Sequence, residues 1–354
     1  MIVVRSAFII ICFLIASLSV SWASVPLKER FSGRSGVSPG IWGSPASWDK
    51  FKPMLEAKGF NRVSAVSYKN DEAFTNTDTI FEVVGKIGKA LDGLRSEKIA
   101  GRKVDVVAHS MGGLVTRALC NSNEMTDLNG KVMTLRELCR EAIRKMITID
   151  TPHRGSELAD WLLLHERHPD DFYNLINTRL ITEGEKELSV DQQETCDEQI
   201  NAFINVNGET AFNLFPIGLH PIGGGVESLA TGGISNLIPQ GGWGTLSNVA
   251  NEVPIHVGIG HLPDVLRFPP FMSSAVWWLQ LQVLDKCGLP RRVVFDGDSD
   301  GIVSVESQSD GVGSYSTDFE DVDHINVTAK SKVIEDVQVL LDEGLNRFAP
   351  ARQP

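Results

Sequence analysis

The serine at position 110 stands in a pattern that is typical of a catalytic nucleophile. Residues Val104–Arg117 read V-D-V-V-A-H-S-M-G-G-L-V-T-R, a compact apolar strand pattern that runs through a tight turn into a helix. Such a turn needs small residues two positions before and two after the serine, and Ala108 and Gly112 meet that need. The turn would expose the hydroxyl of Ser110 and point the amide of Met111 at a developing oxyanion. A structural serine in a glycine-rich turn is the alternative.

Three segments of the chain resemble a known family. H-S-M-G-G-L-V-T-R resembles the nucleophile elbow of the α/β-hydrolase lipases and of the GPI inositol-deacylase-like esterases, with Ala108 where the family usually has glycine. Thr151–Ser156 (T-P-H-R-G-S) is similar to the T-P-H-x-G-S segment of the same group, and Gly40–Trp48 is similar to its oxyanion loop. The resemblance covers roughly residues 39–155 and 253–348. It implies a second oxyanion amide at Ile41 and no cofactor.

A nucleophilic serine needs a base and an acid that orients the base, and in this fold they follow in the order serine, acid, histidine. The family's D-G-x-V pattern matches Asp300 in the loop Asp296–Val303, with Asp298 as the fallback. His324 is the only histidine after that loop, and it precedes the closing helix as the fold requires. The expected catalytic residues are therefore Ser110, Asp300 and His324, with a structural role for His324 as the alternative.

The acidic loop could also be a calcium site, because D-x-D-x-D-G opens an EF-hand loop. Its twelfth position is Ser307, however, and Glu306 comes one place early. No pair of cysteines has the C-x-x-C spacing of a zinc or redox site. We therefore expect no metal.

Strand patterns that alternate with helical ones predict a mostly parallel sheet with helices on both faces. The expected strands are Val63–Tyr68, Val104–Ala108, Met146–Ile149 and Ile255–Ile259, and the expected helices include Thr79–Ile99, a helix from Met111, Leu158–His165 and Lys330–Phe348. Residues from about 156 to 252 have a different character, with an acidic stretch and a glycine-rich apolar segment. We interpret them as a cap inserted into an α/β-hydrolase domain spanning residues 24–354. The alternative is an insertion without a role in substrate choice.

Residues 1–23 have the composition of a signal peptide. Arg5 is their only charge, an apolar run extends from Ala7 to Val20, and Ser21-Trp22-Ala23 supplies small residues for cleavage. The prediction is a secreted or periplasmic protein, and the alternative is an uncleaved anchor. Four cysteines would remain, which permits three pairings, and we prefer Cys120 with Cys139 because that pair closes a short polar excursion.

One segment departs from the family. A buried strand should lead into the oxyanion loop, but Ser32–Gly40 contains glycines, serines and an arginine, with Pro39 where histidine is expected. Three explanations stay open: a local fault in the sequence, another segment in the strand position, or a weak or inactive enzyme.

These observations favour an exported hydrolase of carboxylic esters, and the apolar cap favours lipid-like acyl groups and transient contact with a lipid surface. The net charge of −12 argues against nucleic acid as a partner. A phospholipid or lipid-anchor deacylase, an amidase or peptidase, and a catalytically impaired binding protein on the same scaffold are the alternatives.

Overall fold

A computed structural model of the protein describes part of the chain. The described residues are 8–14, 48–58, 60, 63–66, 103–120, 124–126, 132–205, 229–233, 235–238, 240–241, 253–262, 287–289, 291–295, 297–309, 315–324, 326–343 and 347–348. The predicted helix Thr79–Ile99 and the segment Ser32–Gly40 lie outside them. Among the described helices, none has the length and apolar composition that a bilayer crossing requires.

A six-stranded parallel sheet forms the centre of this described part, in the order β2-β1-β3-β6-β7-β8. All seven residues of β3 are buried, as expected for a central strand covered on both faces. Burial on both faces explains why Val106, Val107 and Ala108 stand side by side in β3 without alternating polar residues. The strands are β1 (Phe8–Leu14), β2 (Val63–Val66), β3 (Val104–Ser110), β6 (Ile143–Ile149), β7 (Ile255–His261) and β8 (Ser316–Glu320).

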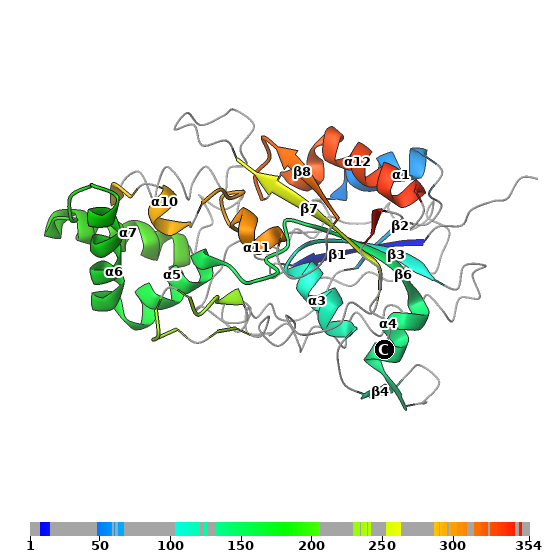
Figure 1. Ribbon diagram of the computed structural model, residues 1–354, viewed down its shortest axis with the longest axis horizontal. Helices are drawn as coiled ribbons and strands as arrows, with labels where there is room; N and C mark the ends of the chain where they lie inside the picture. The colour runs from blue at the N-terminus through cyan, green and yellow to red at the C-terminus, as the bar shows by residue number, and fades with distance from the viewer. Residues whose placement is uncertain are drawn as a thin grey trace, which may run out of the picture.

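Helices cover both faces of the sheet, as predicted. On one face α1 (Phe51–Ala57) packs beside α12 (Ser331–Asp342), and on the other lie α3 (Met111–Leu119) and α4 (Leu135–Ala142) (Figure 1). The first pair buries an apolar cluster against the strands, with Phe51, Leu55, Val107, Ile147 and Val337 among its members.

The last helix is shorter than the predicted Lys330–Phe348, because it ends at Asp342. The ammonium group of the buried Lys145 donates to the carbonyl oxygens of Leu340 and Leu341 at 2.6 and 2.9 Å. A cation at a helix C-terminus satisfies carbonyl groups that have no partner inside the helix. This contact fixes the end of α12 on the sheet.

A short antiparallel hairpin of β4 (Glu124–Thr126) and β5 (Val132–Thr134) connects α3 to α4. Thr134 caps α4 with a capping box. Its hydroxyl oxygen accepts from the amide of Glu137, and the Glu137 carboxylate accepts from the amide of Thr134. A disulfide between Cys120 and Cys139 spans this excursion, which confirms the preferred pairing.

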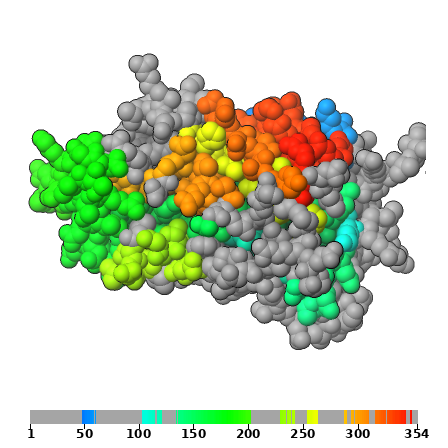
Figure 2. Space-filling view, viewed as in Figure 1, coloured from blue at the N-terminus to red at the C-terminus, as the bar shows by residue number. Residues whose placement is uncertain are grey.

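Three helices that follow β6 form one end of the molecule (Figure 2). They are α5 (Glu157–Arg167), α6 (Pro169–Thr182) and α7 (Val190–Asn205), and they share a hydrophobic core with α10 (Arg291–Val294). A disulfide joins Cys196 of α7 to Cys287. The helical unit therefore includes residues beyond the insertion predicted at 156–252.

The segment predicted as the apolar part of a signal peptide is strand β1. Its register pairs Ile9 with Val63 of β2 and Leu14 with Ser110 of β3. In this arrangement another segment fills the strand position for which Ser32–Gly40 is unsuitable. Cleavage after Ala23 would remove that strand, so the signal peptide and β1 exclude one another in a single mature molecule.

Candidate active site

The turn between β3 and α3 holds Ser110 in an unusual backbone conformation. Ser110 is the last residue of the strand, Met111 is the first of the helix, and the dihedral angles of Ser110 are φ 56° and ψ −140°. A non-glycine residue held at positive φ is strained, and such strain is common where a side chain must be presented for chemistry. The geometry is that of the sharp strand-to-helix turn expected from the sequence.

The structure brings the three predicted catalytic residues together. The Ser110 Oγ atom lies 2.8 Å from His324 Nε2, and His324 Nδ1 lies 2.7 Å from Asp300 Oδ2. All three side chains are buried. With a proton on Nδ1, His324 donates to Asp300 and can accept the hydroxyl proton of Ser110.

Asp300 is held as a hydrogen-bond acceptor by its own loop. Its Oδ1 accepts from the amides of Ile302 and Val303 at 2.9 and 2.8 Å, and Gln308 Nε2 donates to Oδ2 at 3.1 Å. Donors on both oxygens fix the orientation of the carboxyl group. Sequence reasoning missed Gln308, and no local pattern marks it, because the contact depends on the fold of helix α11 (Val305–Ser309).

The two aspartates proposed as the acid, Asp298 and Asp300, differ in their exposure to solvent. Asp298 is exposed and Asp300 is buried, so it is Asp300 that reaches His324. Because both oxygens of Asp300 are already engaged, its carboxylate is not free to bind calcium in this arrangement. Asp296 lies outside the described residues.

Comparisons with known proteins agree with this architecture. A family model described as the PGAP1-like alpha/beta domain matches residues 76–208. The mature form of a Bacillus licheniformis lipase is 14% identical, with 96% of this chain and 93% of that chain covered and a TM-score of 0.50. Staphylococcus hyicus lipase is 13% identical over 96% of each chain, with a TM-score of 0.49. No curated protein matches the sequence. The chain has the α/β-hydrolase fold. The fold class predicted from the sequence is thus confirmed.

Two sequence segments that resemble the family are in contact in this fold. Arg117 Nη1, from the helix after the nucleophile, lies 3.1 Å from His153 Nδ1, and His153 Nε2 lies 3.1 Å from Thr148 Oγ1. Burial, together with the charge of Arg117, holds the pKa of His153 well below its usual value. Neutral His153 thus joins the loop after β6 to α3, and it takes no part in the serine-histidine contact.

Of the two predicted oxyanion donors, Met111 lies among the described residues and Ile41 does not. Met111 is the first residue of α3, where a backbone N–H has no acceptor within the helix. Its amide adjoins Ser110, and its role as an oxyanion donor stays a prediction. Ile41 lies outside the described residues, and its role stays a prediction.

Proposed function

We propose that this protein is a serine hydrolase that cleaves carboxylic esters. The observation that carries the proposal is the buried chain of contacts from Ser110 through His324 to Asp300, at 2.8 and 2.7 Å. The strained turn at Ser110 and the amide of Met111 supply the other parts that acyl transfer needs.

In the proposed mechanism His324 Nε2 takes the hydroxyl proton as Ser110 Oγ attacks the ester carbonyl carbon. Asp300 stabilises the imidazolium that forms, and the Met111 amide, with that of Ile41, stabilises the oxyanion. His324 then gives the proton to the leaving alcohol, which leaves an acyl-enzyme. Water attacks the acyl-enzyme through the same base and releases the carboxylic acid.

The proposed substrate class is an ester of a lipid-like acyl group. It is supported by the fold shared with a bacterial lipase and by the apolar composition of the segment Leu214–Trp243. The PGAP1-like match over residues 76–208 favours a second candidate, a deacylase of phospholipids or lipid anchors. Both reactions would use the same Ser110 chemistry.

We also propose that the protein acts outside the reducing cytosol. Two disulfides, Cys120–Cys139 and Cys196–Cys287, support an oxidising compartment. The signal-like composition of residues 1–23 supports export as well, but β1 uses part of the same segment.

Hydrolysis of p-nitrophenyl esters from acetate to palmitate, by the full chain and by Ser110→Ala, tests the proposal. Activity in the wild type that disappears in the variant would support Ser110 as nucleophile, and the preferred chain length would separate esterase from lipase. Release of fatty acid from phosphatidylcholine vesicles would favour the deacylase. Equal rates in both proteins, or no reaction of folded wild type with a fluorophosphonate probe, would contradict the proposal.

A further inference from the structure

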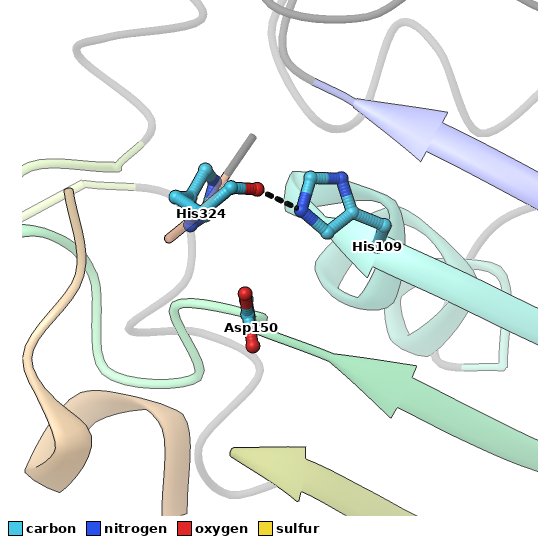
Figure 3. A group of neighbouring side chains, drawn as sticks. All are labelled: His109, Asp150 and His324. Atoms are coloured by element: carbon cyan, nitrogen blue, oxygen red, sulfur yellow. Dashed lines mark hydrogen bonds between the residues drawn. The ribbon is translucent and has the colours of Figure 1, made fainter. Parts of the chain in front are cut away.

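A second buried carboxyl group lies beside the base and has no part in the mechanism above. Asp150 follows β6 directly, with φ at 51°, and its side chain is fully buried. Its Oδ1 accepts from the amide of Gly260 at 2.8 Å, whereas its Oδ2 has no hydrogen-bond partner among the described residues. Figure 3 shows the carboxyl group directed toward His109 and His324. One potential metal-ligand atom from each of these three side chains lies within 4.8 Å of those of the other two.

Two histidines and a carboxylate at this spacing could bind a metal ion. Both ring nitrogens of His324 are already used, Nδ1 by Asp300 and Nε2 by Ser110. A metal would have to displace one of these residues and so break the serine-histidine-aspartate chain. We therefore consider Asp150 as a neighbour of the serine-histidine-aspartate contacts and not as a metal ligand.

The surroundings of Asp150 favour its neutral, protonated form. Burial is the main cause that raises its pKa well above the usual value, and the nearby carboxylates of Asp300 and Asp323 raise it further. The Gly260 amide acts in the opposite direction. The histidines that face it are His324 and His109, and burial, together with the charge of His324, lowers the pKa of His109. Two carboxyl groups beside one histidine do not both ionise readily, so one keeps a proton.

The two acids are connected through β7. The Gly260 amide that reaches Asp150 also lies 2.9 Å from Gln308 Oε1, and Gln308 Nε2 donates to Asp300. A Cβ atom at position 260 would lie 2.5 Å from Asp150 Oδ1, so glycine is needed for the close approach. Asp300 therefore lies close enough to Asp150 for a change in its charge to alter the ionisation of Asp150.

We propose that Asp150 is a positioning residue for His324: its buried carboxyl group lies beside the histidine ring, and it stabilises the imidazolium when Asp300 is lost. The inference rests on the proposed serine-hydrolase function. During normal turnover no proton leaves Asp150, and the proton of Ser110 moves only to His324. When Asp300 is replaced by alanine, the repulsion from its charge disappears but burial remains, so Asp150 ionises only as the imidazolium forms. Its proton leaves to solvent, and its carboxylate stabilises that cation.

A double-mutant cycle of Asp150→Asn and Asp300→Ala tests this role, with kcat and KM for one p-nitrophenyl ester measured from pH 5 to 10. We expect Asp150→Asn to lower kcat about threefold in the wild type and about thirtyfold in the Asp300→Ala background. The residual activity of Asp300→Ala should show an acid limb that the double variant lacks. Equal factors in both backgrounds, or identical pH profiles of the single and double variants, would overturn the inference.

The proton on Asp150 can also be observed without activity. The infrared difference spectrum of Ser110→Ala minus Ser110→Ala/Asp150→Asn should contain the C=O stretch of a protonated carboxylic acid at pH 7. A carboxylate band there instead would contradict the proposal even if a variant of Asp300 fails to fold. Ester hydrolysis that does not depend on Ser110 would refute the proposed function itself, whereas Ser110-dependent hydrolysis with an additive cycle refutes only the role of Asp150.

Discussion

The Nε2 atom of His109 lies 2.7 Å from the backbone carbonyl oxygen of His324, so the residue before the nucleophile holds the backbone of the base. A carbonyl oxygen only accepts, and His109 therefore donates from Nε2. This bond joins the elbow at the end of β3 to the loop that carries His324. It restricts the distance between the two reacting side chains.

Replacing His109 by phenylalanine should lower kcat about tenfold, because the loop of His324 loses a donor while the ring volume is nearly kept. The measurement is kcat for p-nitrophenyl ester hydrolysis, with the melting temperature recorded beside it. His109→Gln keeps an N–H donor and is expected to retain more activity than His109→Phe. If both variants lose activity equally, the hydrogen bond is not the cause.

His109 and His153 should each destabilise the folded protein as the pH is lowered below about 6.5, the ordinary pKa of histidine. Burial lowers the pKa of His109 and His153 in the folded protein, so the unfolded chain takes up protons first. Each histidine then contributes a loss of about 1.4 kcal/mol per pH unit until its folded-state pKa is reached. Urea unfolding at pH 5 to 8 measures the slope. In His109→Phe the slope of the free energy of unfolding against pH should be smaller by the contribution of one histidine. An unchanged slope would contradict the lowered pKa of His109.

The proposed catalytic residues could be named from the sequence because their signals are local. The elbow at Ser110 is one continuous pattern, and His324 follows from its place after the acidic loop. Strand β8 was missed because its residues S-T-D-F-E are mostly polar, and Phe319 is the buried one among them. An edge strand needs little apolar surface and leaves a weak pattern.

Two other features depend on contacts between distant segments. Gln308 and Asp150 reach Asp300 and His324 only through the arrangement of β7 and the loops around it, so no local pattern reveals them.

The apolar run Phe8–Leu14 fits both a buried strand and a signal peptide, because short apolar runs carry no period that distinguishes their uses.

Gly113→Ala should destabilise the protein by about 1–3 kcal/mol, because a Cβ atom there would overlap the side chain of Thr151. The contact joins α3 to the loop after β6, so ester hydrolysis should also fall. Thermal unfolding measures the loss, and Thr151→Ala in the same chain should restore part of it. Gly233→Ala is the control, since among the described residues its Cβ would approach Thr231 Oγ1 alone, at 3.2 Å. Equal melting temperatures for both alanine variants would show that the helix can shift without cost.

A chain that starts at Ser24 should fold poorly compared with the full chain when both are produced without export. Strand β1 pairs with β2 on one side and β3 on the other, and its loss leaves unpaired backbone groups along both neighbours. Leu14 pairs with Ser110 itself, so the loss extends to the nucleophile. Solubility, melting temperature and Ser110-dependent ester hydrolysis are the measurements, and the intact mass of exported protein shows which N-terminus it keeps. A Ser24 chain as stable and active as the full chain would show that β1 is dispensable and would favour the cleaved signal peptide.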